Sequence, residues 1–195
     1  MISPLLPAPF IAVGNHDVAA VRRLLDDGAD PNAWSSLHGQ SLLFTASEVQ
    51  DLTLVRMLLE RGADPNQRLN FRSGIRFGQE VTVLMYAPTA DIATALIEFG
   101  ADVNARDQHG TTALMNAAVF ARIDVVRVLL DCGADVAMRK NGIVRNATAL
   151  DLVEQQMAFW SARPHRPGCQ DCVARRFRYQ AIVRLLRTTS RYATQ

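Results

Sequence analysis

Apolar residues recur at helical spacing in four segments of the chain, and each of these segments stops at a glycine. A recurrence every three to four residues places apolar side chains on one face of a helix. Each segment therefore predicts an amphipathic helix that buries one face. The stripes are Val21, Leu24 and Leu25; Val55, Leu58 and Leu59; Ala95, Leu96 and Ile97; and Val126, Leu129 and Leu130.

A short motif follows every stripe, which shows that the chain repeats itself. It reads GADPN at 28–32 and 62–66, GADVN at 100–104 and GADVA at 133–137. The glycines are 34, 38 and 33 residues apart, a period typical of repeat proteins. A glycine can adopt the left-handed conformation that ends a helix, and the following Asp and Asn are expected to bond their own backbone in a tight turn.

A hydroxyl residue precedes a second apolar stretch in each unit, at Ser41, Thr82, Thr112 and Thr148. These residues are candidate N-caps. The predicted unit is thus a turn, a short helix, a turn and a longer helix, and neither helix can bury its apolar face without the neighbouring unit.

The chain resembles the ankyrin repeat family from about Phe10 to about Arg187, most closely over 107–137. The resemblance implies an all-α solenoid with short hairpin or turn fingers and a concave face that binds proteins. We expect a single domain, 1–195, with atypical first and last units. The approximate units are 1–34, 35–67, 68–105, 106–138 and 139–187, followed by a short tail at 188–195.

Two units depart from the regular pattern. The third has a long finger before Thr82 and a shortened helix pair, and the last has prolines and a glycine in the loop 163–172, which predicts a non-helical turn. The segment 173–187 predicts a helix lying on the preceding repeat. Its predicted apolar stripe is Val173, Phe177, Ala181 and Leu185, widened by Ala174, Ile182 and Leu186. We expect Trp160 to lie in the core or cap.

Composition fits a soluble globular chain, with 49% apolar residues and a mean hydropathy near zero. No apolar run approaches the roughly 20 residues that cross a bilayer, and three cysteines suggest no disulfide framework, so we expect a cytoplasmic protein. Up to residue 138 the chain has 10 Arg against 16 acids, and after it 11 Arg and Lys against 3 acids. The C-terminal part therefore carries a net charge of +8, almost entirely from arginine.

Sequence motifs of enzymes are missing, including phosphate loops, zinc-protease motifs and nucleophile elbows. We therefore predict no enzyme activity and no cofactor. His165, Cys169 and Cys172 have a metal-like spacing, but a structural zinc needs four protein ligands. Two reduced thiols in a loop are the simpler interpretation, and metal binding there stays open.

The predicted function is a non-catalytic module that binds a partner protein through its fingers and inner-helix face, on its own a monomer. A bacterial immunity or inhibitor protein is one specific form of it, by analogy alone. Nucleic acid or another anionic surface bound through the arginine-rich C-terminal helix is the alternative. It is also open whether the long finger at 67–80 binds a partner or packs on its own repeat. The predicted partner-binding residues are Trp34, His38, Phe71, Arg72, Arg76, Phe77, Arg106, His109, Val119, Phe120, Arg139 and Arg145.

Overall fold

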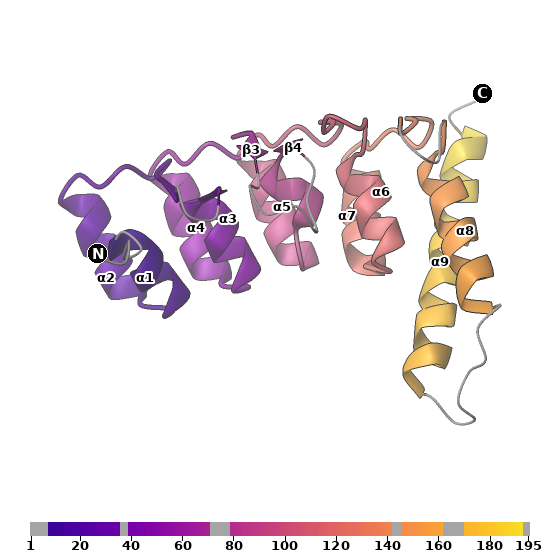
Figure 1. The fold of residues 1–195 in the computed structure, drawn as a ribbon, viewed down its shortest axis with the longest axis horizontal. Helices are drawn as coiled ribbons and strands as arrows, with labels where there is room; N and C mark the ends of the chain where they lie inside the picture. The colour runs from indigo at the N-terminus through magenta and orange to yellow at the C-terminus, as the bar shows by residue number, and fades with distance from the viewer. Residues whose placement is uncertain (1–7, 36–38, 71–78, 142–145, 162–169, 193–195) are drawn as a thin grey trace, which may run out of the picture. The chain divides into compact units, whose positions relative to one another are not determined.

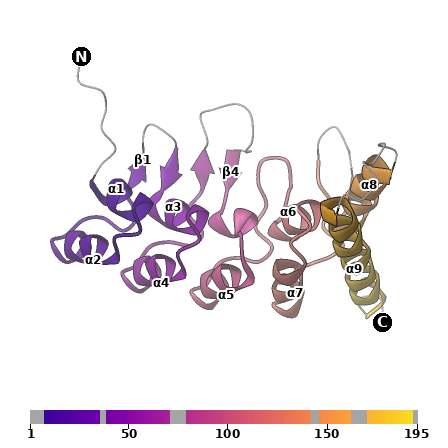
Figure 2. The ribbon, with the colours of Figure 1, turned by 90° about the horizontal axis from the view of Figure 1, so that it is seen from below.

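The computed structural model describes residues 8–35, 39–70, 79–141, 146–161 and 170–192. The chain divides into two compact units, Met1–Asp102 and Val103–Gln195. Both are built from paired helices, with short antiparallel hairpins in the first (Figures 1 and 2). The expected all-α repeat architecture with short fingers is therefore confirmed.

The first unit has two layers of helices. An inner layer of α1, α3 and the 3-10 helix η1 packs against an outer layer of α2, α4 and α5. Two hairpins, β1–β2 and β3–β4, form the fingers, and the second contains a register irregularity at Leu69/Asn70. The elements are α1 (Ala8–Gly14), α2 (Val18–Asp26), β1 (Trp34–Ser35), β2 (Gln40–Ser41), α3 (Leu42–Glu48), α4 (Leu52–Glu60), β3 (Leu69–Asn70), β4 (Gln79–Val81), η1 (Val83–Tyr86) and α5 (Ala90–Glu98).

The second unit contains two helix pairs of unequal length. Helices α6 (Ala113–Val119) and α7 (Ile123–Asp131) have 7 and 9 residues, whereas α8 (Ala149–Ser161) and α9 (Gln170–Tyr192) have 13 and 23. Helix α8 packs on α6, and α9 packs on both α7 and α8. The α8–α9 pair consequently extends past the ends of α6 and α7 (Figure 1).

The predicted caps form at three of the four predicted positions. Ser41 accepts a hydrogen bond from the Phe44 amide at 3.2 Å, and Thr112 accepts one from Met115 at 3.3 Å. Thr148 accepts one from the Asp151 amide at 3.3 Å, while Asp151 accepts from the Thr148 amide in return. Thr82 differs, because it opens a 3-10 helix and makes no side-chain cap. The third helix pair is shortened, as expected.

The glycines of the repeated motif end their helices as predicted. Gly28, Gly62, Gly100 and Gly133 all have positive φ, between 84° and 94°. Asp64 accepts a hydrogen bond from the Asn66 amide at 2.8 Å, and Asp30 and Asp135 form the same local turn.

The asparagine side chains of the motif bond the following turn, which differs from the predicted bond to their own backbone. Asn66 donates from Nδ2 to the Gly100 carbonyl and accepts from the Asp102 amide, both at 2.8 Å. Asn32 joins Gly62 and Asp64 in the same way, and Asn104 joins Gly133 and Asp135. Each amide side chain therefore links its turn to the next one, and we call this series the asparagine ladder. It stops where Ala137 replaces the asparagine.

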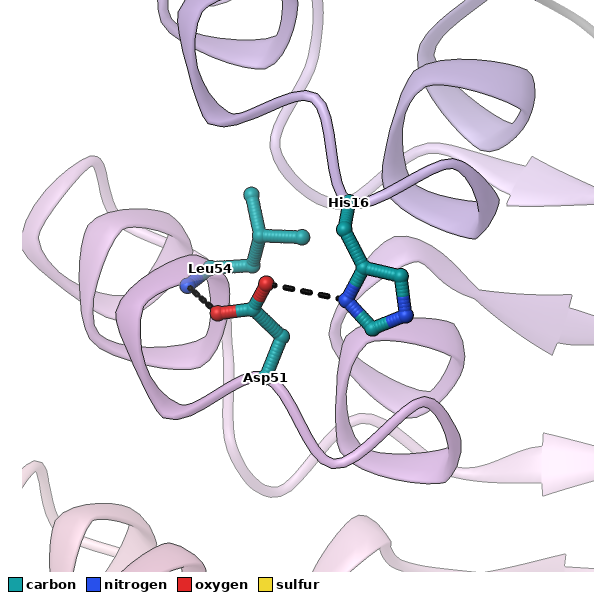
Figure 3. A network of polar contacts seen from close by, with 3 residues as sticks. All are labelled: His16, Asp51 and Leu54. Carbon is teal, nitrogen blue, oxygen red and sulfur yellow. Dashed lines mark hydrogen bonds and ion pairs between the residues drawn. The ribbon is translucent and has the colours of Figure 1, made fainter.

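A further polar contact joins the first two helix pairs (Figure 3). His16 Nδ1 lies 3.1 Å from Asp51 Oδ2, and the other carboxylate oxygen of Asp51 accepts from the Leu54 amide at 3.1 Å. His16 has a φ of 58° in the turn between α1 and α2. Asp51 therefore both caps α4 and holds the preceding turn.

The apolar stripe of the last helix differs from the predicted one. Tyr179, Ile182 and Leu186 are buried, whereas Phe177 is 65% exposed. These three residues lie on one face of α9 because they are three and four residues apart. The helix also begins earlier and ends later than expected, so 170–172 and 188–192 are helical rather than loop and tail. That it lies on the preceding repeat is confirmed.

Candidate partner-binding surface

Trp34 lies on the first finger, where the pairing of β1 with β2 positions its backbone. It stands in β1 opposite Ser41, and the Gly39 amide closes the hairpin by donating to the Ser35 carbonyl at 2.8 Å. The side chain is 38% exposed. His38, predicted on the same finger, lies outside the described residues.

The long finger is described at its base. Leu69 is buried and pairs with Val81, and the Arg68 guanidinium donates to the Glu80 carbonyl at 2.9 Å. Phe71, Arg72, Arg76 and Phe77 lie outside the described residues. Both interpretations of this finger, as a binding element and as a self-packed loop, therefore stay predictions.

In the second unit the fingers are the turns that precede α6 and α8, and arginines join them. Arg106 Nη2 donates to the Arg139 carbonyl at 2.9 Å, and Arg139 Nη1 donates to the Asn146 carbonyl at 2.6 Å. The Asn141 amide donates to the His109 carbonyl at 2.7 Å. Arg106, His109 and Arg139 are all exposed on the fingers. The guanidinium groups of the two arginines and the backbone carbonyl of His109 also hold the loops together. Arg145 lies outside the described residues.

A left-handed glycine makes room for Arg106. Gly110 has a φ of 73°, and a Cβ atom placed on it would lie 2.5 Å from Arg106 Nη2. A side chain at this position would crowd the guanidinium, so the arginine bridge in its present position depends on the glycine.

Phe120 lies at the far end of α6 from its finger. Thr112 caps the finger end of this helix, and Phe120 is the C-cap residue at the other. The ring is 54% exposed, and the guanidinium carbon of Arg122 lies 5.2 Å from its centre. The neighbouring Val119 is half-buried, and its carbonyl accepts the Tyr179 hydroxyl at 2.8 Å. The structure therefore brings the backbone of Val119, next to Phe120 in the chain, to α9.

Sequence reasoning missed a group of aromatic and arginine residues near this end. The Phe159 and Trp160 rings make an edge-to-face pair with centres 5.9 Å apart, and the guanidinium carbon of Arg175 lies 5.0 Å from the Trp160 ring centre. Phe159 is 49% exposed. The sequence carried one signal for this group, the length of the apolar pattern. The pattern in 149–161 is longer than that in 113–119, so a helix formed by 149–161 must extend past the end of a helix formed by 113–119.

Burial and hydrogen bonding shift three titratable groups in the second unit. Burial raises the pKa of Tyr179, with the charge of Arg175 and a hydrogen bond from Trp160 acting in the opposite direction. Burial also lowers the pKa of Arg122, which stays charged because guanidinium is a very weak acid. Hydrogen bonds from Thr148 lower the pKa of Asp151. Each shift reflects a structural contact, and none indicates a proton-transfer group.

No three histidine, cysteine or acidic side chains gather to hold a metal within the described part of the chain. His165 and Cys169 lie outside it, and Cys172 is placed only as a backbone position of α9. In the same part of the chain, no helix is both long and apolar enough to span a bilayer.

The family comparisons agree with this geometry. The family model described as ankyrin repeats (3 copies) matches residues 68–140, and a single ankyrin repeat model matches 38–67. Together these adjoining matches cover a little over half of the chain. The chain belongs to the ankyrin repeat family, whose repeats are generally protein-interaction modules and typically non-catalytic.

Similar curated proteins come from a virus and from mammals. The ankyrin repeat protein FPV233 of fowlpox virus (strain NVSL) is 45% identical over 60 residues, 30% of this chain and 11% of the viral protein. Ankyrin repeat and SAM domain-containing protein 6 is 42% identical over 81 residues in both Rattus norvegicus and Mus musculus, 39% of this chain and 9% of each relative. The chain thus matches about a tenth of the length of these proteins.

Proposed function

We propose that the protein is a non-catalytic module that binds a partner protein through its finger tips and inner-helix face. The proposed contact residues are those predicted from the sequence, led by Trp34 on the first finger. The proposal includes a cytoplasmic monomer before binding. A bacterial immunity or inhibitor protein, which masks a site on its partner, is its most specific form.

The exposed indole of Trp34 is the observation that carries this proposal. A two-residue strand needs no large apolar side chain, yet Trp34 is 38% exposed on a hairpin closed by the Gly39 amide. Tryptophan is among the residues enriched at interface hot spots. Because Trp34 already lies in a paired strand, its backbone loses little conformational entropy when it binds.

Trp34→Ala tests the proposal, and Phe99→Ala is a matched control. Phe99 is also 38% exposed and lies in the first unit, but at the C-cap of α5 rather than on a finger. The partner is first identified by co-purification from the native host and mass spectrometry, and its affinity is then measured by calorimetry. We expect Trp34→Ala to weaken binding roughly 30-fold, equivalent to about 2 kcal/mol. Phe99→Ala should change it less than about twofold.

Equal effects of the two substitutions would contradict the finger assignment. Thermal unfolding of both variants is the necessary control, because loss of folding weakens any interface. A partner that binds both variants like the wild type would place the contact elsewhere on the module.

Binding of nucleic acid or another anionic surface is the second candidate function. It is supported by the exposed arginines of α9, Arg175, Arg176, Arg178, Arg184 and Arg187. Arg187 is engaged with Glu154 at 2.7 Å, which reduces the charge available to phosphates. Binding dominated by phosphate contacts should weaken roughly a thousandfold between about 50 and 200 mM salt for about six contacts. A weaker dependence favours the protein-binding function.

A further inference from the structure

The end of α8 continues an apolar face past α6, one of the two helices that pack on α8. Leu152 and Val153 are buried on α8, and Phe159 and Trp160 follow each of them by seven residues, which is about two helical turns. Helix α6, which packs on α8, has 7 residues against 13. Phe159 and Trp160 therefore stand on the core side of α8 beyond the end of its neighbour. We define the ledge as Phe120, Arg122, Phe159, Trp160 and Arg175.

Tyr179 holds the parts of the ledge together. Its hydroxyl donates to the Val119 carbonyl at 2.8 Å, next to Phe120 in the chain, and it accepts a hydrogen bond from Trp160. The side chain is buried on α9 one turn after Arg175. The ends of α6 and α8 and the first turns of α9 are thus fixed to one another before any partner binds.

Arginines cover two of the ring faces of the ledge. Arg122 lies over Phe120 at 5.2 Å, and Arg175 lies over Trp160 at 5.0 Å. A stacked guanidinium keeps its N–H groups at its edge, where they match the geometry of a carboxylate. The ledge therefore offers charged donors beside partly exposed apolar rings, whereas nucleobases need open ring faces on which to stack.

The charge around the ledge is positive. Residues 103–195 contain 14 Arg and Lys against 7 acids, a net charge of +7, whereas residues 1–102 have 7 Arg against 12 acids, a net charge of −5. Arg175 makes no ion pair with any described residue. A second copy placed ledge against ledge would bring like charges together, which is unfavourable.

We propose that the ledge is a docking site for an acidic protein segment that carries apolar side chains. Its carboxylates pair with the guanidinium edges of Arg122 and Arg175, and its apolar side chains pack on Phe120 and Phe159. The site lies at the end of α6 that is opposite to its finger. It would therefore be a second contact region, separate from the finger surface. It rests on the proposed function insofar as both make the chain a protein-binding module.

The two tryptophans of the chain allow the two regions to be tested separately. In a Trp34→Phe background the intrinsic fluorescence reports on Trp160 in the ledge, and in a Trp160→Phe background it reports on the first finger. The probe is a short synthetic peptide of alternating glutamate and leucine. Its controls are the same peptide with glutamine for glutamate and an oligothymidylate of similar charge.

Arg175→Glu is the decisive variant, and Arg184→Glu is its matched control. Both replace an exposed arginine of α9 and change the net charge equally, but nine residues place Arg184 on the opposite side of the helix from Arg175. We expect the acidic peptide to change Trp160 fluorescence and bind about tenfold more weakly to Arg175→Glu. Arg184→Glu should shift the affinity less than about threefold, as expected of long-range charge alone.

Several results would overturn the proposal. Equal weakening by both variants would indicate diffuse attraction, and equal binding of the glutamine peptide would remove the role of carboxylates. Tighter binding of the oligothymidylate, lost in Arg175→Glu, would assign the ledge to nucleic acid. Sedimentation that shows a wild-type oligomer dissociated by Arg175→Glu would assign it to a second copy. Circular dichroism melts confirm that each variant is folded.

The outcome separates this inference from the proposed function. If the peptide leaves Trp160 unchanged while the native partner alters Trp34 fluorescence, the ledge proposal fails and the finger surface stands. The reverse result removes the finger surface and retains the ledge.

Discussion

At the scale of single residues, the aspartate and the asparagine of the repeated motif have different roles. The aspartate closes its own turn, as Asp64 does with the Asn66 amide. The asparagine presents both a donor and an acceptor to the next turn, which a carboxylate cannot do at neutral pH. This division explains why the two residues stand together in three of the four motifs.

Asn66→Ala should lower the free energy of unfolding by about 2 kcal/mol, because two hydrogen bonds to the next turn are lost. Asn66→Asp keeps the acceptor for the Asp102 amide and loses the donor to Gly100, so we expect an intermediate value. Urea unfolding followed by circular dichroism measures both. Asn15→Ala, at an exposed asparagine between α1 and α2, is the control and should change little. If Asn66→Ala behaves like that control, the ladder contributes no stability.

At the scale of elements, α9 is held by its buried stripe and by one hydroxyl. Ile182 and Leu186 provide the apolar contact, and Tyr179 bonds the carbonyl at the end of α6. That carbonyl belongs to the last turn of a helix, where the backbone has no intrahelical donor. Helix α9 thus supplies a hydrogen-bond donor to the end of α6, and its buried side chains cover the neighbouring core.

The raised pKa of Tyr179 makes stability depend on alkaline pH. Because the folded-state pKa lies above the unfolded value of about 10, this contribution is complete below about pH 10 and is lost as the pH rises through the folded value. We expect Tyr179→Phe to lower the free energy of unfolding by about 1 kcal/mol at neutral pH. Its free energy of unfolding should then fall less steeply than that of the wild type as the pH rises above about 10. Urea unfolding at several pH values compares the two proteins. Identical pH profiles would mean that the hydroxyl titrates as it does in the unfolded chain.

At the scale of the whole molecule, each compact unit contains its own buried leucines. Leu58 on α4 in the first unit and Leu129 on α7 in the second are both fully buried. Repeat proteins gain their stability from the packing of neighbouring repeats, so a cavity in either unit removes contacts on more than one helix.

Leu58→Ala and Leu129→Ala should each lower the free energy of unfolding by about 2 to 5 kcal/mol. Calorimetry and denaturant unfolding provide the measurement. Leu130→Ala is a control in the same helix, because Leu130 is only half-buried. It should lower the free energy of unfolding less than Leu129→Ala does. A Leu129→Ala variant as stable as the wild type would place that side chain outside the core.

The sequence by itself determined the features whose cause is local. The period, the left-handed glycines and the caps at Ser41, Thr112 and Thr148 all follow from backbone preferences and from bonds within a few residues. The predicted cap at Thr82 was wrong because such a cap depends on the helix that follows. In the shortened third unit this helix is a 3-10 helix, and Thr82 makes no side-chain cap.

Tertiary structure decided what each side chain meets. Whether Asn66 bonds its own turn or the next depends on how repeats stack. Whether Phe177 or Tyr179 faces the core depends on the direction from which α7 and α8 pack on α9. The ledge exists because α6 ends where α8 continues, a difference in length between elements that are apart in sequence. Burial is a property of these long-range contacts, so a local pattern predicts which faces are apolar but not which of them remain uncovered.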